Sequence, residues 1–97
     1  MRILIVEDDT RLAQNLSDIL SEAGYLPEIA TDGAAAEYRG ATEIYAAVVL
    51  DLGLPGMAGI DVLRAWRAAG NDMPVLILTA RSDWSDKIAG FRAGADD

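Results

Sequence analysis

The sequence predicts an α/β fold built on a parallel sheet, with helices between successive strands. Short apolar runs rich in β-branched residues occur at residues 3–6, 46–50 and 75–78. Such runs, apolar on both alternating faces, are typical of strands buried on both sides of a parallel sheet. Segments with apolar residues at helical spacing separate them, which favours right-handed strand-helix-strand crossovers. With 97 residues, the chain forms one domain at most.

The first helix is expected to follow the first strand directly. Its apolar residues recur at helical spacing from Leu12 to Ala23, and Gly24 closes it. Asp9 or Thr10 is the expected cap, because short polar side chains accept hydrogen bonds from the free amides of a first turn.

The second strand is expected at residues 26–30 and at an edge of the sheet, because it contains a proline, which cannot donate to a strand ladder. An alanine-rich helix should begin near Asp32 and Gly33 and end before Tyr45, with Gly40 limiting its regularity. Apolar stripes that each end at a glycine predict two further helices: Val62, Leu63, Trp66 and Ala69 before Gly70, and Trp84, Ile88 and Phe91 before Gly94.

The composition excludes several classes of site. The net charge is −8, so we expect no direct binding of nucleic acid by this segment. The absence of cysteine and histidine excludes disulfides, thiolate zinc sites, Ser-His triads and most transition-metal sites. The apolar run at residues 3–6 is too short for a signal peptide or a membrane span, so we expect a cytoplasmic protein without membrane contact.

Acidic residues follow two of the predicted strands. Glu7 and Asp8 come directly after the first strand, and Asp51 comes at the end of the third. Because ligands bind beyond the carboxyl ends of the strands in open parallel sheets, we expect these side chains to converge. Unpaired carboxylates so close together raise one another's pKa, and a divalent cation removes the conflict. Mg²⁺ prefers carboxylates and water as ligands, so the sequence predicts a magnesium site.

The same edge of the sheet carries a candidate phosphoacceptor. An aspartate can act as a nucleophile towards a phosphoryl group, and Asp51 precedes a glycine- and proline-containing loop at residues 52–56 that allows close approach of main-chain amides. Thr79 supplies a hydroxyl after the fourth strand. Taken singly, residues 7–9 are equally well explained as a helix cap, and Asp51 and Thr79 as ordinary strand ends. Their combination favours a site.

Several segments together resemble the receiver domain of two-component response regulators. They are ILIVEDD at residues 3–9, VLDLGLPGM at 49–57 and LTAR at 78–81, extended by Gly90-Phe91 and by GADD at 94–97. The resemblance covers the whole chain and is greatest to the branch that carries a winged-helix DNA-binding domain downstream.

This resemblance implies a CheY-like, flavodoxin-like sheet of strand order 2-1-3-4-5, of which this chain is expected to hold 2-1-3-4. It also implies phosphotransfer from a sensor histidine kinase to Asp51. It implies that Asp8, Asp51 and the main-chain carbonyl of Gly53 bind Mg²⁺ directly, while Glu7 acts through water. It also implies that Thr79 donates a hydrogen bond to the phosphoryl group and moves towards it, which couples the site to the surface.

The sequence departs from the family pattern in two places. Ala58 stands where the family often has Asp or Asn, and we expect little consequence. After residues 94–97 the family continues into a fifth strand and helix with a Lys-Pro pair, whereas the only lysine here, Lys87, is expected at the surface of the last helix. We therefore expect a receiver domain over residues 1–97 that is C-terminally incomplete and signals weakly. We expect it either to be unstable or to self-associate through an open apolar edge at residues 75–78.

The sequence is compatible with three functions. The first is a signalling switch, a phosphoacceptor and not a turnover enzyme, whose output in the full-length protein is transcriptional regulation. The second is a pseudo-receiver or assembly module that uses the fold for protein contacts alone. The third is an aspartate-nucleophile phosphatase, which needs a second acid two residues after the nucleophile; that position is Gly53, which disfavours it.

Overall fold

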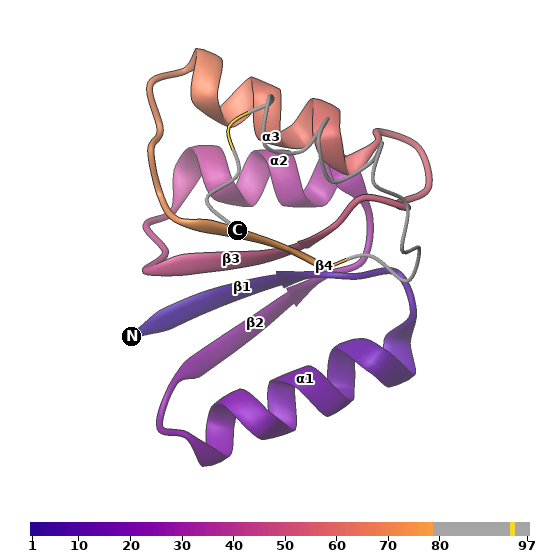
Figure 1. Cartoon of the computed structure of the whole chain (residues 1–97), viewed down its shortest axis with the longest axis vertical. Coiled ribbons are helices and arrows are strands. Elements are labelled where there is room, and N and C mark those ends of the chain that lie inside the picture. The colour runs from indigo at the N-terminus through magenta and orange to yellow at the C-terminus, as the bar shows by residue number, and fades with distance from the viewer. Residues whose placement is uncertain (79–93, 95–97) are drawn as a thin grey trace.

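The computed structural model describes residues 1–78 and residue 94, and its centre is a four-stranded parallel sheet in the order β2-β1-β3-β4 (Figure 1). This order confirms the α/β architecture and the arrangement that the resemblance implies. Val6 pairs with both Ala30 and Leu50, so β1 and β2 end level with each other and β3 ends one residue further on. The proline-containing strand lies at the edge of the sheet, as predicted. The strands are β1 (Arg2–Val6), β2 (Leu26–Ala30), β3 (Ala47–Asp51) and β4 (Val75–Leu78).

Helices cover both faces of this sheet (Figure 1). Helix α1 (Thr10–Glu22) lies against one face, and α2 (Gly33–Thr42) and α3 (Gly59–Ala68) lie side by side against the other. The helix predicted around residues 84–91 lies outside the described residues. Within residues 1–78, no helix has the length and apolar character needed to cross a membrane.

The ends of the helices follow the expected capping chemistry. Asp9 caps α1, because its Oδ1 accepts hydrogen bonds from the amides of Arg11 and Leu12, each at 3.1 Å. Gly24 after α1 and Gly70 after α3 have φ values of 93° and 82°, a region that favours glycine. These positions confirm where both helices were predicted to stop.

The main core lies between the sheet and the pair α2–α3, and Trp66 is its largest fully buried side chain. Its indole Nε1–H donates to the main-chain carbonyl of Glu37 on α2 at 3.2 Å. A Cβ atom at Gly40 would lie 2.6 Å from Cζ2 of this indole. The expectation that Gly40 limits the regularity of this helix is wrong, because α2 continues through Gly40 to Thr42. The missing side chain makes room for Trp66.

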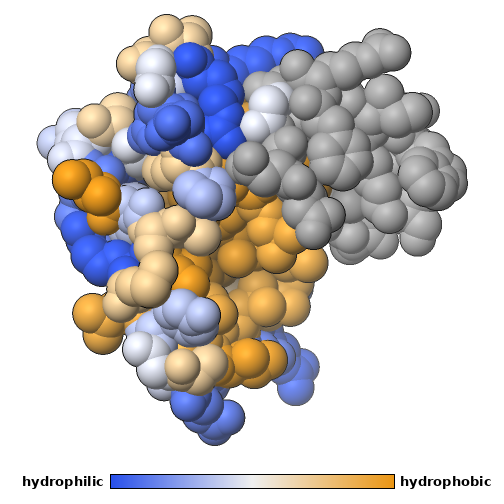
Figure 2. Space-filling model, turned by 60° about the vertical axis from the view of Figure 1, so that its left-hand side comes forward, coloured by the Kyte–Doolittle hydropathy of each residue, from blue (hydrophilic) through white to orange (hydrophobic). Residues whose placement is uncertain are grey.

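The opposite face of the sheet is less completely covered. In α1, Ala13 is the only buried residue, and Ile19 on the same helix is 62% exposed. On β4, Leu76 is 46% exposed. Apolar side chains gather at the surface in the view of Figure 2. Part of the apolar surface that the sequence predicted to be buried therefore remains accessible among the described residues.

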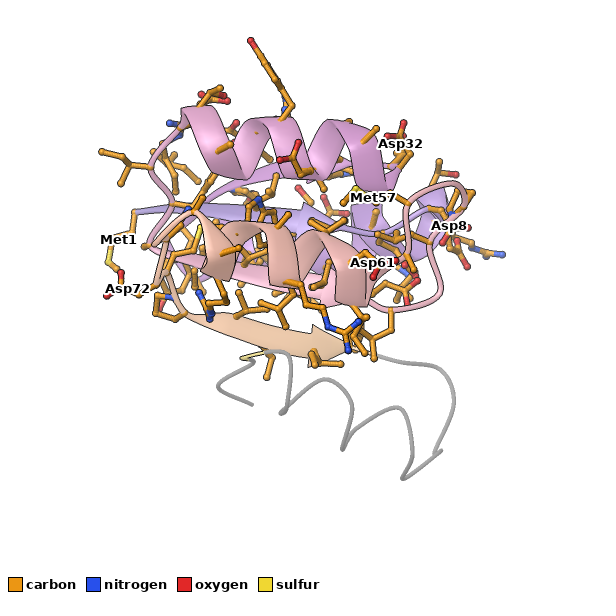
Figure 3. The ribbon with its side chains drawn as sticks, turned by 90° about the horizontal axis from the view of Figure 1, so that it is seen from above. Met1, Asp8, Asp32, Met57, Asp61 and Asp72 are labelled. Atoms are coloured by element: carbon orange, nitrogen blue, oxygen red, sulfur yellow. The ribbon has the colours of Figure 1, made fainter. Side chains whose placement is uncertain are left out.

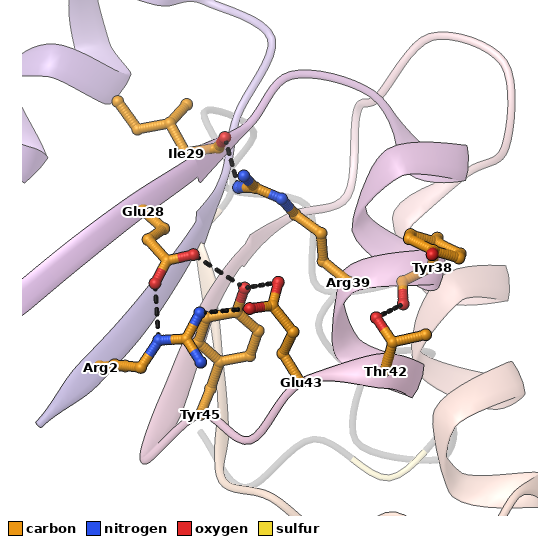
Figure 4. Close-up of polar contacts among 8 residues, drawn as sticks. All are labelled: Arg2, Glu28, Ile29, Tyr38, Arg39, Thr42, Glu43 and Tyr45. Carbon is orange, nitrogen blue, oxygen red and sulfur yellow. Dashed lines mark hydrogen bonds and ion pairs between the residues drawn. The ribbon is translucent and has the colours of Figure 1, made fainter.

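A polar network joins β1, β2 and the α2–β3 connection near the amino ends of the strands (Figure 4). The Arg2 guanidinium pairs with Glu28 at 2.7 Å and with Glu43 at 2.6 Å, and it lies 4.8 Å from the centre of the Tyr45 ring. Hydrogen bonding to Arg2 lowers the pKa of both glutamates. The network stabilises the end of the sheet that faces away from the acidic residues Glu7 and Asp8.

Candidate functional site

The acidic residues predicted from the sequence meet at the carboxyl ends of β1 and β3. Glu7 and Asp8 directly follow β1, and Asp51 is the last residue of β3. Each of the three carboxylates offers an oxygen atom, and these atoms all lie within 4.8 Å of one another. Figure 3 places Asp8 at the end of the molecule opposite Met1. The neighbouring ends of β1 and β3 thus bring together residues that are more than forty positions apart in the sequence.

Glu7 is the buried member of this cluster, with 5% of its surface exposed. Its main-chain amide donates to the carbonyl oxygen of Ala30 at 3.0 Å, which ties it to the end of β2. Its Oε2 is buried and has no hydrogen-bond partner. Burial, followed by the neighbouring carboxylate of Asp51, raises the pKa of Glu7 to about 8.

These features fit a hard divalent cation. A buried carboxylate oxygen without a partner costs free energy, and a cation bound among the three side chains would satisfy it and offset their mutual repulsion. All the candidate metal-ligand atoms are carboxylate oxygens. Asp8 is exposed, which leaves room for water molecules as further ligands. Oxygen donors with several waters are the coordination that Mg²⁺ prefers.

The loop after Asp51 shapes the other side of the cluster. The amide of Gly53 donates to Asp51 Oδ1 at 3.0 Å and so fixes the carboxylate at the end of β3. Leu54 is buried, which anchors the loop to the core, and Gly56 has a φ of 71°, which favours glycine at this turn. Asp51 itself is half-buried, so part of this residue stays accessible to solvent.

The structure brings together four of the five residues predicted for the site. Glu7, Asp8 and Asp51 form the cluster, and Gly53 contacts it through its amide; the direction of its carbonyl towards the cluster stays a prediction. Thr79, and with it Lys87, lies outside the described residues.

Two glycines that contact the loop after Asp51 were not predicted as part of the site from the sequence. Gly33 at the start of α2 is buried against Met57, and Gly59 at the start of α3 is buried against the main chain of Asp51 and Leu52. The sequence signal that could have identified them is a glycine at the first turn of each predicted helix. Glycine has no advantage in helix propensity there, so its presence indicates a close contact.

Comparisons with known proteins agree with this geometry. A family model described as the response regulator receiver domain matches residues 3–97. The chain is 44% identical over 97 residues to the two-component response regulator PhoP of Pseudomonas aeruginosa, and 42% identical to the transcriptional regulatory protein TctD of Salmonella typhimurium. Both alignments include 100% of this chain but only 43% of the relative, so the chain spans less than half the length of these proteins.

Solved structures give the same result for the fold. The response regulator TrrA of Thermotoga maritima, in complex with Mg²⁺-BeF, superposes with a TM-score of 0.88 at 32% sequence identity, covering 98% of this chain and 81% of TrrA. Strand order, acidic cluster, family match and structural likeness lead to one conclusion. The chain belongs to the response regulator receiver domains of two-component systems.

Proposed function

We propose that this chain is a phosphoacceptor that takes a phosphoryl group onto Asp51 from a sensor histidine kinase. The observation that carries the proposal is the cluster of Glu7, Asp8 and Asp51, whose oxygen atoms lie within 4.8 Å of one another at the carboxyl ends of the strands. Asp51 is half-buried and therefore reachable by a phosphodonor, while the Gly53 amide holds its Oδ1.

The proposed cofactor is Mg²⁺, bound directly by Asp8, Asp51 and the Gly53 carbonyl, with Glu7 acting through a water molecule. When bound, the ion orients the phosphoryl group and neutralises its oxygens. The orphaned Oε2 of Glu7 supports a cation at this place. TrrA, the structural relative at 32% identity, is a complex with Mg²⁺-BeF.

The transfer that we propose is a single displacement at phosphorus. A carboxylate oxygen of Asp51 forms a bond to phosphorus while the phosphorus–nitrogen bond to the kinase histidine breaks. The histidine nitrogen keeps the electron pair, and Asp51 becomes a mixed anhydride that lasts until water hydrolyses it. Thr79 would then donate a hydrogen bond to the phosphoryl group, as the resemblance implies. The chain is in this view a switch and not a turnover enzyme.

The output of the switch belongs to the full-length protein. The curated relatives are response regulators, and TctD is a transcriptional regulatory protein. We therefore propose that phosphorylation regulates transcription in the cytoplasm through a part of the protein beyond this domain. This domain, with its net charge of −8, would contact the kinase and not DNA.

Intact mass spectrometry after incubation with acetyl phosphate and Mg²⁺ tests the proposal. We expect one added phosphoryl group on the wild type, none on Asp51→Asn, and none when a chelator removes the ion. Asp18→Asn, an exposed aspartate on α1, is the matched control and should be modified like the wild type. Folded protein that binds Mg²⁺ yet gains no mass would instead favour the assembly module.

A further inference from the structure

Helices α2 and α3 both begin with a buried glycine that contacts the loop at residues 52–58. A Cβ atom at Gly33 would overlap the carbonyl oxygen of Met57 and lie 2.8 Å from its carbonyl carbon. A Cβ atom at Gly59 would overlap the carbonyl oxygen of Asp51 and lie 2.9 Å from Cα of Leu52. Ordinary carbon–oxygen contacts are about 3.3 Å or longer. The two helix starts therefore hold the loop near its two ends, and neither leaves room for a side chain.

The start of α2 is held in place by its own capping hydrogen bond and so fixes the position of Gly33 next to Met57. Asp32 caps the helix, and its Oδ1 accepts from the amide of Ala35 at 2.7 Å. Figure 3 places Asp32 and Met57 at the same end of the molecule as Asp8. Farther along α2, Trp66 on α3 donates to a main-chain carbonyl of α2, as described above, and so ties the two helices together. A side chain at Gly33 would consequently displace the loop more readily than the helix.

We propose that Gly33 is a positioning residue, and that the contact between Gly33 and Met57 seats the loop so that Asp51 and Gly53 are held in the geometry that Mg²⁺ requires. This inference rests on the proposed function, because it gives the loop a role in holding the metal ligands. The Met57 side chain is half-buried and packs against the core, so the loop also has a contact with the core at this residue.

The expected consequence is large because Mg²⁺ tolerates little distortion. It requires near-octahedral ligands at about 2.0–2.1 Å. A methyl group at Gly33 would force the Met57 carbonyl to retreat by roughly 1 Å to reach an ordinary contact. Residues that orient metal ligands typically change metal affinity by about 10- to 100-fold when mutated. We therefore expect Gly33→Ala to raise the dissociation constant for Mg²⁺ about tenfold or more.

Gly40→Ala is the matched control. It places the same methyl group on the same helix, where it meets the indole of Trp66 instead of the loop. Both variants should melt at a lower temperature than the wild type. Titration calorimetry with Mg²⁺, run well below the lowest melting temperature, should show weaker binding for Gly33→Ala alone. Equal affinity of the two variants, whether both unchanged or both weakened, would overturn the positioning role.

A second pair keeps the test decisive if Gly33→Ala does not fold. Met57→Ala loosens the loop without adding a clash, while Met73→Ala shortens a buried methionine that precedes β4, away from the loop. We expect Met57→Ala to weaken Mg²⁺ binding more than Met73→Ala does, even though Met73 is the more buried of the two methionines. The reverse order would overturn the inference. A wild type that binds no Mg²⁺ would overturn the proposed function itself, which is a distinguishable result.

Discussion

Replacing Glu7 by glutamine should stabilise the metal-free protein at alkaline pH. The Glu7 side chain is buried with an oxygen that lacks a partner, and its pKa is raised from the ordinary value of 4.5 to about 8, first by burial and then by Asp51. Between these two pH values, folded Glu7 keeps its proton while unfolded Glu7 has lost it. The folded state binds more protons, so the free energy of unfolding falls as pH rises. Glutamine is neutral at every pH and removes this loss.

The size of the effect follows from the width of the pH window. Stability is lost at up to about 1.4 kcal/mol for each pH unit while the proton is held by the folded state alone. From pH 5 to pH 8 this amounts to about 3 kcal/mol, with allowance for partial ionisation near each end. For a domain of this size, that corresponds to a melting temperature lower by roughly 12–24 °C.

Urea unfolding in a chelating buffer, at several pH values between 5 and 8, measures this difference. We expect Glu7→Gln to match the wild type near pH 5 and to exceed it by about 3 kcal/mol near pH 8. Glu22→Gln, an exposed glutamate at the end of α1, should follow the wild-type curve. Excess Mg²⁺ should remove most of the stability advantage of Glu7→Gln, because Mg²⁺ binding stabilises the wild type with Glu7 ionised. Parallel pH curves for the wild type and Glu7→Gln would refute the reasoning.

Three further substitutions test other parts of the structure. Arg2→Met should lower the melting temperature at neutral pH and much less near pH 3, because Arg2 lowers the pKa of Glu28 and Glu43 and their contribution is lost as they take up protons; thermal melts at the two pH values check this. Ala58 is the N-cap residue before α3 and makes no side-chain capping hydrogen bond, so Ala58→Asn should stabilise the domain by about 1 kcal/mol in urea unfolding. Leu76→Lys should reduce self-association of the 97-residue chain in sedimentation velocity, since Leu76 is 46% exposed and β4 pairs with β3 alone among the described residues. A wild type that sediments as a sharp monomer and melts cooperatively would contradict the last expectation.

The strands and most helix ends could be predicted because their signals are local. Runs of β-branched residues mark β1, β3 and β4, and the proline placed β2 at an edge. The acidic cluster could be predicted as well, because parallel strands must end at the same edge of the sheet whatever the packing around them. This rule alone was enough to predict that Asp51 and Asp8 lie close together.

The remaining features depend on contacts between distant segments, which no local pattern records. Gly40 looked like a weak point of its helix, yet it is the place where Trp66 packs, 26 residues later in the sequence. The burial of Glu7 follows from how β1 and β2 end, and not from its neighbours in sequence. The contact of Gly33 with Met57 likewise needs both helices in place.

Asp51 is the residue that we propose to receive the phosphoryl group. Borohydride reduction converts an aspartyl phosphate to homoserine, so peptide mass spectrometry of protein treated with acetyl phosphate and Mg²⁺ locates the acceptor directly. We predict homoserine at position 51, and only when the phosphodonor and Mg²⁺ are both present. Homoserine at Asp8 or at another acidic residue, or none at all in folded protein that binds Mg²⁺, would contradict the account.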